Sequence, residues 1–78
     1  MDSLRAGLAA ALRELRQDRA LSQERLATAA GLHRSFVHRL ERGTVNVSLD
    51  ALQQLAGALE VPVSRLLALA EELGSREE

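Results

Sequence analysis

One short segment, residues 34–42, carries the side chains best suited to binding chemistry. At about 100° per residue along a helix, its polar side chains fall on one face and its apolar side chains on the other. The polar face consists of Arg34, Ser35, His38, Arg39 and Arg42, and the apolar face consists of Phe36, Val37 and Leu40. An arginine guanidinium can donate two parallel hydrogen bonds to a phosphate or to O6 and N7 of guanine. The polar face is therefore a candidate surface for contact with nucleic acid.

Each of these residues also has a plainer interpretation. Arg34, Ser35 and Arg39 would suit an ordinary solvated helix face, and His38 could face either a DNA strand or solvent. Phe36 fits a half-buried core position as well as contact with a thymine methyl group. His33 and His38 are five residues apart and would not share a helix face, and without cysteine we expect no metal site.

The hydrophobic periodicity predicts an all-α fold of five helices that positions this face. The expected helices span about 3–19, 23–30, 34–41, 49–59 and 63–73. Ser22 and Ser48 are suitable N-caps, and Gly31 suits the sharp turn between the second and third helices. We expect Gly74 to end the fifth helix. The chain reads as one domain over 1–78, with a core of about 4–73 and a frayed tail at 74–78.

Composition supports a helical domain and narrows its function. Sixteen Leu and 13 Ala stand against one Pro and one aromatic residue, and the absence of Cys excludes disulfides. No apolar run approaches the roughly 18 residues of a membrane span, so we expect a cytoplasmic protein without a signal peptide. The sequence shows no catalytic acid pair, nucleophile set or glycine-rich phosphate loop, so we expect no enzyme, no cofactor and no small-molecule substrate.

Charge is distributed unevenly along the chain. Residues 1–43 contain eight Arg and five acidic residues, a net of +3, whereas residues 44–78 contain two Arg and six acidic residues, a net of −4. The overall net charge of −1 is low for a DNA-binding protein, but this asymmetry indicates a basic face directed toward nucleic acid and an acidic side directed away from it.

Several phrases of the sequence resemble the lambda repressor/Cro-like family of helix-turn-helix regulators, also called XRE-type. They are Leu12-Arg-Glu-Leu-Arg16, Leu21-Ser-Gln-Glu-Arg-Leu-Ala27, Ala30-Gly-Leu32, Leu40-Glu-Arg-Gly43, Asn46-Val-Ser-Leu49 and Leu59-Glu-Val-Pro62. The resemblance implies a five-helix DNA-binding domain whose second and third helices form the motif. In length and in the loop around Asn46, the chain is similar to the controller proteins of restriction–modification systems, although phage repressors and host regulators share the same parts.

The resemblance also implies roles for individual residues. Gln23 and Asn46 would contact DNA phosphates, whereas Arg34, Ser35 and Arg39 would face bases or nearby backbone. Arg42, on the same polar face, is a further candidate for a phosphate contact. Arg16 and Glu41 match an intramolecular ion pair. His33 stands where the family usually has a Ser or Thr cap, so both this cap and the contact with DNA expected there are in doubt.

The fifth helix has more apolar positions than one narrow stripe requires. They are Leu66, Leu67, Leu69, Ala70 and Leu73. Either they all close the bundle, or some remain outside the core and form a homodimer interface, which we favour. The sequence thus predicts a homodimeric transcription regulator that binds a pseudo-palindromic double-stranded DNA operator. The alternative is an antitoxin-like module whose main partner is a toxin protein.

Overall fold

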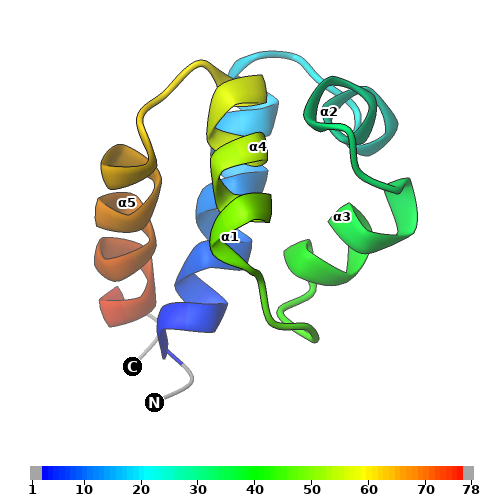
Figure 1. Ribbon diagram of the computed structural model, residues 1–78. Helices are drawn as coiled ribbons and strands as arrows, with labels where there is room; N and C mark the ends of the chain where they lie inside the picture. The colour runs from blue at the N-terminus through cyan, green and yellow to red at the C-terminus, as the bar shows by residue number, and fades with distance from the viewer. Residues whose placement is uncertain (1–2, 77–78) are drawn as a thin grey trace.

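The computed structural model describes residues 3–76, whose regular elements are five α-helices joined by short connections (Figure 1). They are α1 (Ser3–Asp18), α2 (Gln23–Ala30), α3 (Arg34–Glu41), α4 (Leu49–Leu59) and α5 (Val63–Arg76). In the view of Figure 1, α5 lies on one side, α1 and α4 lie in the middle, and α2 and α3 lie on the other side. The predicted all-α fold is confirmed, and the three middle helices have the predicted bounds.

The core lies where the apolar stripes of the five helices converge. Its largest fully buried side chains are Leu12, Leu26, Val37, Leu55, Leu59 and Leu66. The spacing of Leu4, Leu8, Leu12 and Leu15 predicts one apolar stripe along α1. Leu8 and Leu15 are buried as predicted, but Leu4 is 49% exposed. The core therefore includes every helix and begins one turn into α1.

Helices α1 and α5 approach each other closely at Gly7. A Cβ atom added to Gly7 would lie 1.8 Å from the carbonyl oxygen of Ala70 and 2.6 Å from the backbone nitrogen of Gly74. Gly74 is itself buried and helical, and α5 continues to Arg76. The predicted end of α5 at Gly74 is wrong because this glycine serves the contact with α1. The part of the expected frayed tail at 74–76 is helical, and residues 77–78 lie outside the described residues.

Most of the apolar residues assigned to a dimer interface belong to the monomer core. Leu66 and Ala70 are fully buried and Leu69 is 9% exposed, so these three offer almost no surface to a partner. Leu67 and Leu73 are partly buried against the same core. The apolar excess of α5 is thus largely explained by its packing within one chain.

The expected caps and turns define the helix-turn-helix segment. The hydroxyl oxygens of Ser22 and Ser48 accept hydrogen bonds from the backbone N–H groups of Arg25 and Ala51, each at 3.0 Å. Gly31 has φ +71°, the left-handed conformation that ends α2 and turns the chain toward α3. Pro62, which precedes α5, accepts from the backbone N–H of Arg65 at 3.0 Å.

Candidate nucleic-acid interface

Packing against α2 determines which face of α3 reaches solvent. Val37 and Leu40 of α3 are 0% and 3% exposed, and Leu26 and Ala27 of α2 are 0% and 2% exposed. Ala27 is small, which suits the close crossing of two short helices. Burial of this apolar face leaves the opposite face of α3 outward.

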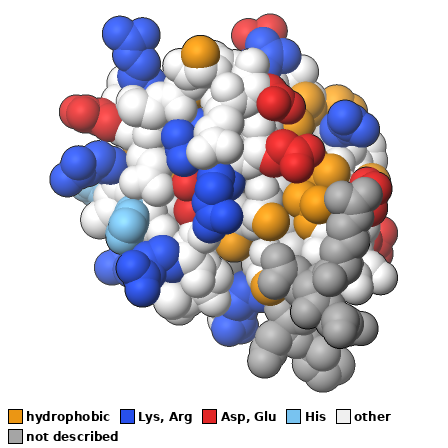
Figure 2. Space-filling model, turned by 180° about the vertical axis from the view of Figure 1, so that it is seen from behind, with side chains coloured by type: hydrophobic (Ala, Val, Ile, Leu, Met, Phe, Trp, Pro, Cys, Tyr) orange, Lys and Arg blue, Asp and Glu red, His pale blue; other side chains and the backbone are white. Residues whose placement is uncertain are grey.

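The polar side chains predicted for recognition all lie on that outward face. Arg34, Ser35, His38, Arg39 and Arg42 are exposed, and Phe36 is half-buried and packs against the core. Seen from behind, histidine lies among arginines at one edge of the molecule, and further arginines continue toward the middle of this face (Figure 2). The structure therefore brings the predicted donors together on one surface and keeps Phe36 mainly as a packing residue.

A buried polar network fixes the end of α3 against α1. Glu41 is 3% exposed and the Arg16 side chain is 13% exposed. Arg16 Nε donates to Glu41 Oε2 at 2.7 Å and Arg16 Nη2 donates to Oε1 at 3.0 Å, so the ion pair is bidentate. A third donor of Arg16, Nη1, binds the carbonyl oxygen of Leu21 at 2.8 Å. One side chain thus ties α1, the connection that leads into α2 and the end of α3 together.

Gln23 belongs to this network. Its Nε2 donates to Glu41 Oε1 at 3.0 Å, and its Oε1 lies 3.4 Å from Nδ1 of His38. We expected the Gln23 side chain to contact phosphate, but here its amide joins the core network to the outward face. Nothing in the sequence distinguishes these two roles, because each suits a polar residue at the start of α2.

Two arginines of α1, Arg5 and Arg13, make specific contacts with other parts of the chain. Arg5 Nη2 donates to Oδ1 of Asn46 at 2.5 Å, which links α1 to the loop between α3 and α4. Arg13 Nη2 donates to the carbonyl oxygen of Glu41 at 2.7 Å and so satisfies a free acceptor at the end of α3. Their separation of eight residues, with Ala9 midway, places them on one face of α1 and is the signal that could have identified them.

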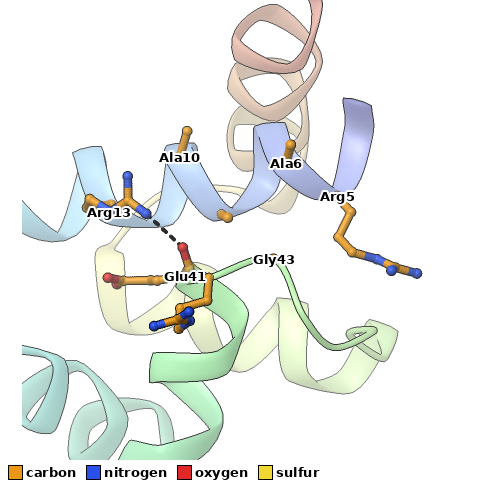
Figure 3. Close-up of a pocket in the computed structure, with 8 residues that line it drawn as sticks. Arg5, Ala6, Ala10, Arg13, Glu41 and Gly43 are labelled. Atoms are coloured by element: carbon orange, nitrogen blue, oxygen red, sulfur yellow. Dashed lines mark hydrogen bonds between the residues drawn. The ribbon is translucent and has the colours of Figure 1, made fainter. Parts of the chain in front are cut away.

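These two arginines line an open groove of about 380 Å³ between α1 and the end of α3. The lining residues are Arg5, Ala6, Ala9, Ala10, Arg13, Glu41, Arg42 and Gly43. Figure 3 shows Arg13 directed at Glu41 and Arg5 at the other end of the groove, with α1 alanines between them. Short alanine side chains leave the groove open.

His33 begins α3 without the usual capping bond. Its φ of −77° and ψ of 143° resemble the backbone conformation of the serine cap Ser22, but its side chain makes no cap hydrogen bond within residues 3–76. The sequence-based prediction of a weakened cap is confirmed.

Two other kinds of feature, metal-ligand clusters and membrane-spanning helices, are absent from residues 3–76. Within residues 3–76, no group of three or more His, Cys, Asp or Glu side chains is arranged to hold a metal ion. No helix in that range combines the length and the apolar character needed to cross a membrane.

Comparison with known proteins matches this arrangement to one family. A family model described as helix-turn-helix matches residues 12–66. The control protein C.SmaI of Serratia marcescens is 45% identical over 60 residues, which cover 77% of this chain and 71% of that protein. The control protein C.BamHI of Bacillus amyloliquefaciens is 47% identical over 47 residues, which cover 60% of this chain but only 58% of that protein.

Solved structures show the same likeness. The crystal structure of the restriction–modification controller protein C.AhdI from Aeromonas hydrophila superposes with a TM-score of 0.77 at 46% identity, covering 78% of this chain and 92% of that one. The clp gene regulator ClgR from Corynebacterium glutamicum superposes with a TM-score of 0.89 at 32% identity, covering 95% of this chain and 79% of that one. With the family match over residues 12–66, these likenesses show that the chain belongs to the XRE-type helix-turn-helix family of DNA-binding transcription regulators.

Proposed function

We propose that this chain acts as a homodimeric transcription regulator that binds a specific pseudo-palindromic DNA operator. The observation that carries the proposal is the outward face of α3, where exposed arginines and other polar side chains stand opposite the buried Val37 and Leu40. A helix with this division can lie in the major groove while its other face holds it to the domain.

In the proposed complex, α3 reads bases and its surroundings contact the DNA backbone. Arg34, Ser35 and Arg39 face base edges, and an arginine on guanine discriminates by roughly 1–3 kcal/mol per well-formed pair. Arg42 and the side-chain amide nitrogen of Asn46, whose oxygen binds Arg5, contact phosphates, with His38 beside them. Gln23 lies at the start of α2, beside the proposed path of the DNA backbone. Its side-chain amide already binds Glu41, so it contributes to DNA binding by its position and not by that amide.

The operator is expected to have two half-sites about 34 Å apart, because a two-fold symmetric dimer presents two copies of α3 one turn of DNA apart. The dimer contact is proposed to use apolar side chains that the fold leaves at the surface, such as Leu4 and Leu49, which are 49% and 77% exposed. Leu67 and Leu73 of α5 can add to it, whereas the buried Leu66, Leu69 and Ala70 cannot add much.

The control of a restriction–modification system is the more specific proposal. It is supported by the similarity to C.SmaI, C.BamHI and C.AhdI, whose names identify them as control or controller proteins. Regulators of other kinds are also similar to this chain, among them the clp gene regulator ClgR.

The test begins with a duplex selected from a random-sequence pool by binding to the purified protein. Arg39→Ala is expected to weaken binding to that duplex by roughly 5- to 150-fold, because a base contact worth about 1–3 kcal/mol is lost. Binding to an unrelated duplex should change far less. Fluorescence anisotropy at fixed salt measures both affinities.

Arg65→Ala is the matched control, since Arg65 is an exposed arginine on α5, away from the proposed interface. It should bind like the wild type. A selection that returns no preferred sequence, or equal affinity of wild type and Arg39→Ala for the selected duplex, would contradict the proposed function. Recovery of a second small protein bound to the chain would instead favour the antitoxin-like alternative.

A further inference from the structure

We propose that α1 forms a second contact with the DNA backbone, in which Arg5 and Arg13, together with Arg42, bind successive phosphates of one strand beside the segment read by α3. This inference rests on the proposed function, because it needs DNA seated on the outward face of α3. It assigns a role to the groove between α1 and the end of α3, which helix-turn-helix geometry alone does not require.

The first argument is unbalanced charge. Three exposed arginines line the groove, and the ion pairs Arg16–Glu41 and Arg19–Glu60 involve none of them. The acidic residue of the groove, Glu41, directs both carboxylate oxygens to Arg16 and contributes its backbone carbonyl to Arg13. The groove therefore presents net positive charge that an anion would neutralise.

The second argument is the spacing of the donors. Arg5 and Arg13 lie eight residues apart, which is about 12 Å along a helix axis. Figure 3 shows them at opposite ends of the groove. Their guanidinium groups bind different partners, Asn46 and the Glu41 carbonyl, and do not converge on one point, whereas a DNA strand places a phosphate at about every 3.4 Å of its axis. The arrangement fits an extended polyanion better than free phosphate.

The third argument is continuity with the face proposed to read DNA. Arg42 lies on the polar arc of the α3 segment and also lines the groove. Asn46, in the loop that follows, accepts a hydrogen bond from Arg5 and thereby holds this guanidinium beside the loop. A strand that leaves Arg42 and Asn46 can thus continue along α1.

The experiment measures how binding to the selected duplex depends on salt for the wild type, Arg5→Gln and Arg5→Lys. Each phosphate contact contributes about 0.9 to the slope of log affinity against log salt concentration. Arg5→Gln should lower the slope by about 0.9 and weaken selected and unrelated duplexes by a similar factor, because a phosphate contact carries no sequence information. Arg5→Lys should retain most of the slope.

Ethylation of single phosphates in the duplex locates the contact. Ethylation of phosphates outside the bases read by α3 should weaken binding by the wild type. The same ethylations should no longer affect binding by Arg5→Gln. Arg65→Gln, on α5, is the control and should match the wild type in both measurements. Arg5 is exposed, and equal melting temperatures of the variants would show that the fold is intact.

The outcomes separate this inference from the proposed function. A wild type that selects no sequence contradicts the proposed function. If the wild type selects a sequence, but Arg5→Gln has the same salt slope and the same ethylation-interference pattern as the wild type, the contact by α1 is contradicted. A third outcome is that inorganic phosphate shifts the backbone amide NMR signal of Gly43 in the wild type but not in Arg5→Gln, while the two proteins bind DNA alike. That result would reassign the groove to a free anion and would also overturn the contact by α1.

Discussion

Helix α1 holds two neighbours by different kinds of interaction. Against α5 it presents Gly7, and the backbones come so close that a single methyl group would meet the Ala70 carbonyl at 1.8 Å. Against α3 it presents Arg13 and Arg16, which bind the backbone and the side chain of Glu41. The contact of α1 with α5 depends on close fit of the two helices, and its contact with α3 depends on directed polar bonds.

The difference corresponds to what each neighbour has to do. Close apolar packing stabilises α5 but imposes few directional constraints. Hydrogen bonds to the backbone carbonyl and to the carboxylate of Glu41 constrain the direction of α3. A recognition helix needs such a fixed direction. We therefore expect changes on the two faces to have different consequences for stability and for DNA binding.

The largest effect is expected at the polar face, with Glu41→Ala. Loss of the carboxylate leaves the Arg16 guanidinium, only 13% exposed, without its partner, and the free energy of unfolding should fall by about 3 kcal/mol. Urea unfolding monitored by circular dichroism measures this. Binding to the selected duplex should weaken as well, even under conditions where the variant remains folded.

The double variant Arg16→Met/Glu41→Leu makes the comparison sharper. Replacement of both charged residues by apolar ones removes the unpaired charge and should restore much of the stability. DNA binding should remain weakened if the bonds also direct α3. Full recovery of both properties would show that the polar face contributes stability alone.

A smaller effect is expected at the apolar face, with Gly7→Ala. The added methyl group meets backbone atoms of α5 that cannot rotate away, so the helices must separate, at a cost of about 2 kcal/mol. Gly57→Ala in α4 is the matched control, because a Cβ there has no neighbour within 4 Å; it should stabilise by roughly 0.5–1 kcal/mol. Thermal unfolding distinguishes them. A Gly7→Ala protein as stable as the wild type would refute the close contact.

The smallest effect is expected from His33→Ser at the start of α3. The backbone there already has a cap conformation, so a serine hydroxyl can accept from the first turn as at Ser22 and Ser48. The gain should be about 0.5–1 kcal/mol in the free energy of unfolding. Affinity for DNA should stay the same unless His33 itself touches the operator. A loss of stability would mean that His33 makes another contact.

The sequence predicted the fold well because its helix signals are local. Ser22, Gly31 and Ser48 determine boundaries through their own backbone preferences and nearest turns, and the structure places those boundaries as expected. The prediction that Gly74 ends α5 was wrong because the role of this glycine is not local. It resembles a helix stop, but its role depends on Gly7, which is distant in the sequence and adjacent in the fold.

The candidate site divides in the same way. The outward arc of α3 follows from helical periodicity, so its exposed residues could be predicted. The shared face of Arg5 and Arg13 on α1 could be read from their spacing, but their contacts with Asn46 and Glu41 join residues 41 and 28 positions apart and could not be predicted. The apolar surplus of α5 was similarly ambiguous, because the sequence cannot show that Leu66 and Ala70 pack against the other helices of the same chain.

The side chains of Arg34, Ser35 and Arg39 are not bonded to the rest of the described domain, and this has a further consequence. Their side chains make no hydrogen bond or ion pair within residues 3–76, and the core lies beneath the opposite side of α3. Random substitution at these three positions should therefore leave most variants folded. That freedom makes the domain a suitable starting point for libraries selected against new DNA sequences, and it lets related regulators diverge in target while keeping one framework.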